Sequence, residues 1–493
     1  YINRCSYMLQ QGLFVGDVLY YYGDDVPNFV FIKEEAKDLP AGYDWDKCSG
    51  SVILNRISIS GNKIILPDGM SYRLLVLPDE KSIDIKVLRK IQNLVNEGMI
   101  LIGPPPEKPS GLSGYPRSDE ELKTIVRRLW GKIDGNTVTE NRFGKGKVIW
   151  GKSLAEVLIE MNVPPDFYFT GSTGETSLDF IHRSTQNQEI YFVLNRFEYK
   201  GVNDFNYRYN PELPDRYEEV ECYFRVKGKV PEIWDPISGE IKDVLVYREE
   251  GDYTVIPLHF NPGESKFVVF KEGRNERHII EIQKDGKSFF PKGTFAPNNF
   301  PYLTIERHNN VCEATIFEPG EYRFTWSDGQ ENRLSVSSSP IAIPIAGLWQ
   351  VNFNPRWGGP GTIMIDTLAS WTDFSDEGIR YYSGRASYSC QFAMPDGIGY
   401  NEVFLLDMGN VQEIASVSLN GSQSKVCWMP PFRVDVTNAI KMGRNELKID
   451  VINLWPNRLI GDSKLPEGKR LTKTNVQKFY KPGSEIYLRV SGL

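Results

Sequence analysis

The stretch that decides the fold is residues 72–103, YRLLVLPDEKSIDIKVLRKIQNLVNEGMILIG. Residues 74–77 and 99–102 are short continuous apolar runs, as expected of parallel strands that are buried on both faces. Ser82 is a candidate helix cap, and Gly98 can adopt the backbone conformation that ends a helix. We therefore expect a right-handed βαβ unit, whose helix buries one apolar stripe formed by Ile83, Val87, Ile91, Leu94 and Val95.

Composition narrows the function classes. The 493 residues include 57 Lys and Arg against 64 Asp and Glu, a formal net charge of −7. Such an acidic balance gives no electrostatic support for binding nucleic acid or an anionic membrane surface. No apolar run approaches the ~20 residues of a membrane-spanning helix. At ~100–200 residues per domain, we expect several domains, each with its own core.

The chain opens at Tyr1 without a Met. We expect a helix over residues 4–11, followed by an aromatic strand over residues 13–25. A helix feeding a single strand cannot bury itself alone. We therefore expect residues 1–40 to be the last helix–strand step of a (β/α)8 barrel whose earlier part is missing. Active sites lie at the carboxyl ends of barrel strands, which makes candidates of Tyr21, Tyr22, Asp24 and Asp25. The alternative is a polar turn that caps a strand.

A second candidate segment is residues 42–50, GYDWDKCSG, in which two aspartates alternate with aromatic residues between glycines. Carboxylates beside aromatic rings suit sugar hydroxyl recognition or acid–base chemistry. Its candidate residues are Tyr43, Asp44 and Asp46. The alternative is an Asx turn followed by a helix capped by Asp46 or Ser49.

Residues 41–165 form the expected α/β domain, and its motifs point to a structural role. Capping boxes begin at Ser118 and Ser153. Three prolines after Gly103 remove amide donors, and neither GxGxxG nor GxxxxGK[ST] is present, so we expect no nucleotide cofactor. We see no strand–Cys–helix elbow for a nucleophile. The six cysteines lack CxxC spacing, which argues against a zinc site or a redox cofactor.

From about residue 167 the apolar period becomes two, which predicts β-sheet. We expect a β-sandwich over residues 166–274, with strands at 190–194, 219–226, 244–247 and 266–270. A smaller β connector follows over residues 275–344, with a turn at Asp328-Gly329. Residues 345–493 predict a jelly-roll sandwich.

Segments of the last domain resemble the sugar-binding-like, galactose-binding-like jelly roll of family 2 glycoside hydrolases. They are LWQVNF at 348–353, YYSGRASY at 381–388, LDMGNVQEIASVSLNG at 406–421 and GRNELKIDVINLWPNRLIGD at 443–462. The order of the whole chain resembles glycoside hydrolase family 106, whose known activity is α-L-rhamnosidase. The stretches that carry this resemblance are residues 4–27, residues 41–79, IHR…YFVLNR within 181–196 and EIWDPISGEI at 232–241.

The resemblance implies a catalytic (β/α)8 barrel, a flavodoxin- or amidotransferase-like α/β domain and then β-sandwiches. It also implies removal of terminal α-L-rhamnose with inversion by two carboxylates, a calcium ion near the sugar, and a periplasmic or extracellular location. The two catalytic glutamates would lie before Tyr1, in an N-terminal barrel portion that acts as the partner of this chain. The segments of Tyr21–Asp25 and Tyr43–Asp46 would then line the rim of the sugar site.

Two further readings stay open. A non-catalytic carbohydrate-binding protein could use the terminal jelly roll, with side chains that stack on and hydrogen-bond a sugar; for each the alternative is core packing or domain docking. These candidates are Trp371, Arg380, Tyr381, Trp428, Trp455 and Arg458. An α/β enzyme acting through the middle domain is disfavoured, because that domain shows neither a nucleophile nor a phosphate loop.

Overall fold

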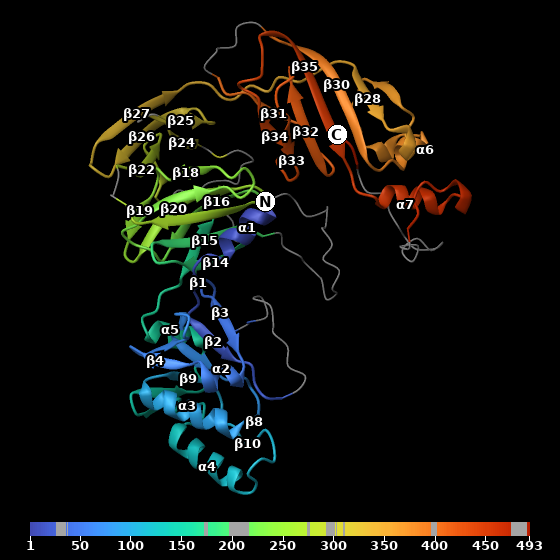
Figure 1. The fold of residues 1–493 in the computed structure, drawn as a ribbon. Helices are drawn as coiled ribbons and strands as arrows, with labels where there is room; N and C mark the ends of the chain where they lie inside the picture. Colours follow the sequence, from blue (N-terminus) through green and yellow to red (C-terminus); the bar gives the residue numbers. More distant parts are fainter. Residues whose placement is uncertain are drawn as a thin grey trace. The chain divides into compact units, whose positions relative to one another are not determined.

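The structure is a computed structural model that describes residues 1–25, 36, 38–171, 176–196, 216–273, 277–291, 301, 303–308, 311–395, 402–474 and 491–493. The chain forms two compact units (Figure 1). Unit 1 comprises residues 1–198, 218–260 and 264–338. Unit 2 comprises residues 199–217, 261–263 and 339–493.

Unit 1 contains an α/β layer built on a six-stranded sheet. The strand order is β11-β12-β9-β7-β2-β3, with β11 antiparallel and the other strands parallel. These strands are β11 (Glu140–Phe143), β12 (Gly146–Ile149), β9 (Ile100–Ile102), β7 (Leu74–Val76), β2 (Val18–Tyr21) and β3 (Trp45–Cys48). The expected βαβ unit is confirmed, because α3 (Ile85–Glu97) connects the parallel neighbours β7 and β9.

Helices cover both faces of this sheet (Figure 1). One face packs against α2 (Gly50–Asn55), α3 and α4 (Arg117–Leu129) through one large apolar cluster. The other face packs against α5 (Leu154–Glu160), which buries Leu154, Val157 and Leu158. Short strands complete the layer: β4 (Ser58–Ser60), β5 (Lys63–Ile65) and β6 (Ser71–Tyr72) form a three-stranded sheet, and β8 (Ser82–Ile83) pairs with β10 (Lys108–Pro109).

The helix termini confirm some of the expected caps and correct others. Ser153 and Glu156 form the expected reciprocal capping box of α5. Gly98 ends α3 with a positive φ of 135°, but Asp84 rather than Ser82 caps its start, accepting a hydrogen bond from the Lys86 amide. The Ser118 capping box is wrong, because α4 begins before Ser118 and buries this side chain within the first turn.

The expected barrel step over residues 1–40 is corrected by the pairing of its strands. The apolar run breaks into β1 (Leu13–Phe14), which pairs antiparallel with β14 of the sandwich, and β2, which lies between β7 and β3. Because both edges of β2 are occupied, it is an interior strand of the open α/β sheet. The helix α1 (Ile2–Leu9) packs against the sandwich. Residues 26–35 and 37 of this range lie outside the described residues.

The β-sandwich of unit 1 has a six-stranded and a four-stranded sheet around an aromatic-rich core. The first sheet contains β1, β14 (Leu178–Ser184), β15 (Gln188–Asn195), β21 (Ser265–Lys271), β17 (Val230–Trp234) and β18 (Ile241–Asp243). The second contains β13 (Phe167–Gly171), β16 (Glu218–Phe224), β20 (Tyr253–Phe260) and β19 (Arg248–Glu250). The strand expected at residues 244–247 is wrong, because this segment makes only an isolated bridge from Val246 to Ile279.

The connector packs on the outer face of the second sheet, where Tyr223 and Val255 join its core. Its strands are β22 (Ile279–Lys284), β23 (Lys287–Phe290), β24 (Leu303–His308), β25 (Val311–Ile316), β26 (Gly320–Trp326) and β27 (Glu331–Val336). The turn at Asp328-Gly329 joins β26 to β27, as expected. The connector and the second sheet of the sandwich therefore share one hydrophobic core.

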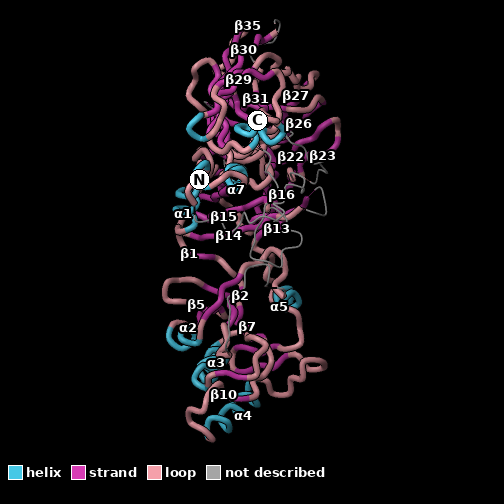
Figure 2. The backbone as a smooth tube through the Cα atoms, turned by 90° about the vertical axis from the view of Figure 1, so that its right-hand side faces the viewer, coloured by secondary structure: helices cyan, strands magenta, loops and turns pink. Residues whose placement is uncertain are grey.

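Unit 2 is dominated by a six-stranded sheet of order β29-β28-β30-β35-β32-β33, with a two-stranded sheet β31-β34. Figure 2 shows its strands β29, β30 and β35 in magenta. Burial alternates along β28 (Trp349–Phe353), which places Trp349, Val351 and Phe353 in the core. The other strands are β29 (Thr362–Ile365), β30 (Arg385–Met394), β31 (Leu405–Asp407), β32 (Ile414–Leu419), β33 (Lys425–Cys427), β34 (Arg433–Asp435) and β35 (Gly443–Ile452). The helices are η2 (Pro355–Trp357), η3 (Trp371–Asp373), α6 (Glu377–Arg380), α7 (Pro456–Ser463) and η4 (Glu467–Lys469).

Candidate functional site

The first candidate site lies at the carboxyl edge of the parallel sheet, where open α/β sheets bind ligands. Strand β2 ends at Tyr21, and the following turn carries Asp24 and Asp25. The backbone amides of Asp24 and Asp25 donate to the Glu80 carboxylate at 3.1 and 3.4 Å. Glu80, which follows β7, therefore anchors this turn from the neighbouring strand.

The side chains of the two aspartates in turn accept hydrogen bonds from the residues just before α3. One Asp24 carboxylate oxygen accepts a hydrogen bond of 2.7 Å from the Asp84 amide. One Asp25 carboxylate oxygen accepts a hydrogen bond of 2.7 Å from the Ser82 hydroxyl. The carboxylates expected to face a sugar thus fasten the β2 turn to the β7–α3 loop. Burial and the nearby Asp24 raise the pKa of Tyr21, so its phenol stays protonated.

A strand–Cys–helix junction is present after all, at the adjacent edge strand. Strand β3 ends at Cys48 and α2 begins at Gly50. The Cys48 thiol is buried, and burial together with Asp46 raises its pKa to about 12. Because the thiolate is the nucleophile, this cysteine is inert at neutral pH.

The remaining rim candidates lie elsewhere on the sheet. Tyr43 and Asp44 precede β3, at the end opposite Tyr21; the Tyr43 hydroxyl donates to the Val163 carbonyl at 2.7 Å, and Asp44 accepts from the Trp45 amide at 2.9 Å. Asp46, within β3, accepts a hydrogen bond of 2.8 Å from the Tyr72 hydroxyl. Val18 pairs with Trp45, and Tyr21 pairs with Cys48. The strand therefore separates Tyr43 and Asp44 from the Tyr21 end by about 10 Å. They do not form one site.

A hollow of about 520 Å³ lies beside the β1 edge of the sandwich. It is lined by residues 12–15, 69–71 and 184–186, none of which was a sequence candidate. These residues include no carboxylate and no histidine, so the hollow has no group for acid–base catalysis.

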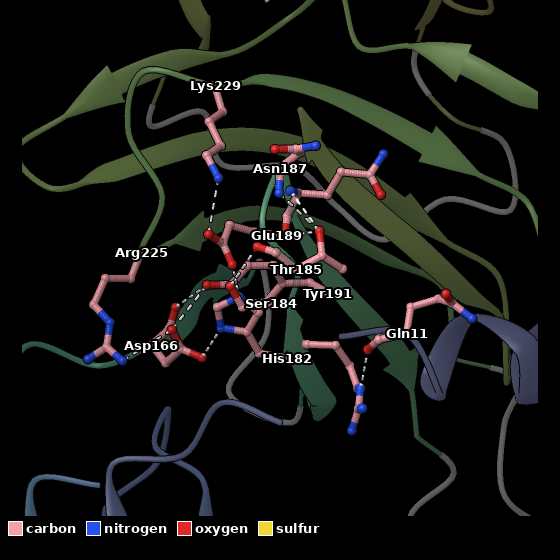
Figure 3. A network of polar contacts seen from close by, with 12 residues as sticks. Gln11, Asp166, His182, Ser184, Thr185, Asn187, Glu189, Tyr191, Arg225 and Lys229 are labelled. Carbon is pink, nitrogen blue, oxygen red and sulfur yellow. Dashed lines mark hydrogen bonds and ion pairs between the residues drawn. The ribbon is translucent and has the colours of Figure 1, made fainter. Parts of the chain in front are cut away.

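A buried polar network, which the sequence analysis missed, joins the α/β layer to the sandwich (Figure 3). Both nitrogens of the His182 ring form hydrogen bonds with carboxylates. Nδ1 lies 2.8 Å from the Asp166 carboxylate, and Nε2 lies 3.2 Å from the Glu189 carboxylate. The ring stacks on Tyr191 with centroids 3.9 Å apart. Arg225 lies 3.3 Å from Asp166. These residues are dispersed along the chain, and no local motif marks them.

The pKa values of Asp166 and His182 in this network are shifted from their ordinary values. Burial alone would raise the pKa of Asp166, but His182 and Arg225 outweigh it and hold this pKa below its ordinary value. Burial likewise opposes protonation of His182, but Asp166 and Glu189 raise its pKa overall. Asp166 is 2% exposed and His182 4% exposed, so a glycan cannot reach them. We assign the network a structural role.

The six expected sugar-binding residues of unit 2 divide by burial. Trp371 is 1% exposed, and its indole N–H donates to the Tyr388 hydroxyl at 2.6 Å. Trp371 is therefore a core residue and cannot stack on a sugar. Tyr381 and Arg458 are also buried; Arg458 pairs with Asp462 at 3.1 Å. The exposed candidates are Arg380, Trp428 and Trp455.

Within the described part of the chain, no three side chains of His, Cys, Asp or Glu come together to hold a metal ion. None of the described helices has both the length and the apolar character needed to cross a membrane.

Comparisons with known proteins place the chain among the glycoside hydrolases. The model of the alpha-L-rhamnosidase family, glycoside hydrolase family 106, matches residues 1–249, half of the sequence, and the chain belongs to this family. A solved rhamnosidase from Novosphingobium sp. PP1Y is 28% identical and superimposes with a TM-score of 0.70 over 100% of this chain and 39% of its own. A protein from Formosa agariphila named "Putative beta-glucuronidase" is 28% identical over 94% of this chain and 52% of its own length. The chain thus spans about half the length of the curated relative it matches.

Proposed function

We propose that this chain is the C-terminal part of a hydrolase that removes terminal α-L-rhamnose from plant-type polysaccharide. The observation that carries the proposal is the structural likeness to the Novosphingobium rhamnosidase, which extends over 100% of the chain at 28% identity. The family match over residues 1–249 supports it independently. The reaction is an inverting hydrolysis by two carboxylates, which need a separation of ~6.5–9.5 Å to admit water.

We further propose that the catalytic acid and base belong to a barrel domain that precedes Tyr1 in the whole enzyme. The geometry of Asp24 and Asp25 supports this assignment, because both carboxylates hold a turn through hydrogen bonds of 2.7 Å. This chain would then support the barrel and contribute to its glycan-facing surfaces. A periplasmic or extracellular location follows from the same proposal, since the polysaccharide lies outside the cytoplasm.

Calcium is a separate prediction of the family resemblance. Within the described residues, no three acidic, histidine or cysteine side chains meet, so no carboxylate cluster there identifies a calcium site. Calcium takes about 6–8 oxygen ligands from carboxylates, backbone and amide carbonyls and water. We therefore assign no calcium ligand within the described residues and route no step of the reaction through the ion.

The decisive experiment measures rhamnose release from an aryl α-L-rhamnoside and from a pectic oligosaccharide. It compares this chain alone with a longer protein that carries the barrel domain before Tyr1. Activity only in the longer protein, with β-rhamnose as the first anomer seen by proton NMR, is the expected result. Hydrolysis by this chain alone, abolished by Asp24→Asn or Asp25→Asn, would place the chemistry here and overturn the proposal.

Substrate specificity needs its own control, because the names of the relatives differ. The longer protein should be offered an aryl β-glucuronide in parallel with the rhamnoside. Preference for the rhamnoside supports the proposal. Preference for the glucuronide contradicts the rhamnose assignment while leaving the hydrolase class intact.

A further inference from the structure

Unit 2 exposes two tryptophans that lie against each other. Trp357, the last residue of η2, is 41% exposed, and Trp455, which precedes α7, is 58% exposed. Their ring centroids are 6.3 Å apart, with an angle of 59° between the ring planes. Indoles at this distance touch, so they present one continuous aromatic surface with a bend. By contrast, Trp349 and Trp371 of the same unit are buried.

The backbone on both sides of this pair is held in place. Asn354 caps η2 by accepting a hydrogen bond from the Arg356 amide, and Pro355 and Pro456 restrict the two helix starts. The Trp455 carbonyl accepts from the Leu459 amide at 3.1 Å. The pair is therefore presented by ordered elements, so little entropy is lost when a ligand stacks on it.

The surroundings of the pair are amphipathic. Leu454 is 46% exposed and Leu471 is 40% exposed. Leu471 lies beside Gly358, the residue after Trp357, since a Cβ built on Gly358 would come within 2.5 Å of its side chain. The exposed Arg356 precedes Trp357 and supplies guanidinium donors. Exposed indoles next to hydrogen-bond donors match a pyranose, which has an apolar C–H face and a hydroxyl-bearing rim.

We propose that Trp357 and Trp455 form a carbohydrate-binding surface on which the apolar face of a pyranose ring stacks. Arg356 donates hydrogen bonds to hydroxyl or carboxylate groups at the rim of the same sugar. The occupant is a glycan because the chain belongs to a carbohydrate-active family. The inference uses this class alone and does not depend on rhamnose specificity or on the position of the catalytic carboxylates.

The test measures binding rather than hydrolysis, with the full 493-residue chain. Oligosaccharides of three kinds, rhamnose-containing pectic, glucuronic-acid-containing and neutral glucan, are titrated by calorimetry, with tryptophan fluorescence as a second signal. Trp357→Ala and Trp455→Ala should each weaken binding at least tenfold, which corresponds to about 1.4 kcal/mol. Trp455→Tyr should retain most of the affinity, because it keeps an aromatic face.

Met364→Ala is the control, since Met364 on β29 is 52% exposed in the same unit and is not a sugar-binding candidate. This variant should bind as the unaltered chain does. Equal losses in all three alanine variants would overturn the proposal, as would absence of binding by the unaltered chain. Concentration-dependent dimers that vanish in Trp357→Ala, without glycan binding, would instead identify the pair as an interface between copies. Circular dichroism of each variant separates lost binding from lost folding.

Discussion

Arg225 and Asp17 lie 208 residues apart in the sequence, yet the Arg225 guanidinium contacts the Asp17 carboxylate at 3.0 Å. Arg225 follows strand β16 of the sandwich, and Asp17 precedes strand β2 of the α/β layer. The same guanidinium donates to the Pro164 carbonyl at 2.6 Å. One side chain thus holds both ends of the chain segment that forms the α/β layer.

Replacing Arg225 should destabilise unit 1 severely. In Arg225→Met, buried Asp17 keeps only Arg73, at 3.5 Å, as an ion-pair partner among the described residues. Among the same residues, buried Asp166 keeps only His182, at 2.8 Å. Removing one partner from a buried ion pair costs up to about 3–5 kcal/mol. Urea unfolding followed by tryptophan fluorescence measures the loss. Arg89→Ala is the control, because its ion pair with Glu121 lies at the surface and should contribute under about 1 kcal/mol. Equal effects of the two variants would contradict the role given to Arg225.

Stability should depend on pH through His182. Its pKa is raised in the folded chain, since the effect of Asp166 and Glu189 exceeds that of burial. A raised pKa means that the contribution is complete below the ordinary value of about 6.5 and is lost as the pH rises through the folded value. The free energy of unfolding should therefore fall on the alkaline side. Urea titrations between about pH 6 and about pH 9 check this.

The variant His182→Gln isolates the histidine from other titrating groups. Glutamine can still hydrogen-bond Asp166 but cannot carry the charge, so the alkaline decline should flatten. Asp166 acts in the opposite direction: its pKa is lowered, so its contribution is present at neutral pH and is lost on acidification. An alkaline decline of the same size in both proteins would assign it to groups other than His182.

Two serines that looked alike in the sequence should respond differently to alanine. Ser153 caps α5 and accepts from the Glu156 amide at 3.2 Å, so Ser153→Ala should cost about 1 kcal/mol. The Ser118 hydroxyl is buried without a hydrogen-bond partner among the described residues, so Ser118→Ala should be neutral or stabilising. Thermal unfolding of both variants measures the two changes in stability. A larger loss from Ser118→Ala would contradict the start of α4.

Cysteine reactivity should follow burial. Cys312 is exposed, whereas Cys48 is buried with its pKa raised to about 12. A maleimide reagent at neutral pH should therefore modify Cys312 first and leave Cys48 unmodified until the chain unfolds. Peptide mass spectrometry over time identifies the sites. Early modification of Cys48 would revive it as a nucleophile candidate.

Elements that depend on local patterns could be predicted from the sequence. The βαβ unit over residues 72–103 was correct, because its strand burial and helical stripe are encoded in neighbouring residues. The separation of β1 from β2 was missed. Both strands lie in one apolar run, and their partners are chosen by contacts with distant segments, such as the pairing of Leu13 with Ser184.

The candidate sites show the same limit. Asp24 and Asp25 were correctly placed after the carboxyl end of a strand, but their hydrogen-bond partners, Ser82 and Asp84, come from another loop. Asp166, His182 and Arg225 carry no motif that unites them, so only the folded chain reveals the network. Trp357 was overlooked because exposure is a property of the tertiary structure.

The pairing of α1 and β1 with the sandwich has a consequence for synthesis on the ribosome. Arg183 donates to the Gln11 carbonyl across 172 residues, and the whole α/β layer is translated between them. At about 5–20 residues per second, roughly 10–35 seconds pass before the partner strand emerges. During that delay the apolar face of α1, with Cys5 and Met8, has no sandwich to cover it. The apolar face of α1 therefore stays without its sandwich partners until the ribosome has translated the whole inserted layer and the strands that follow it.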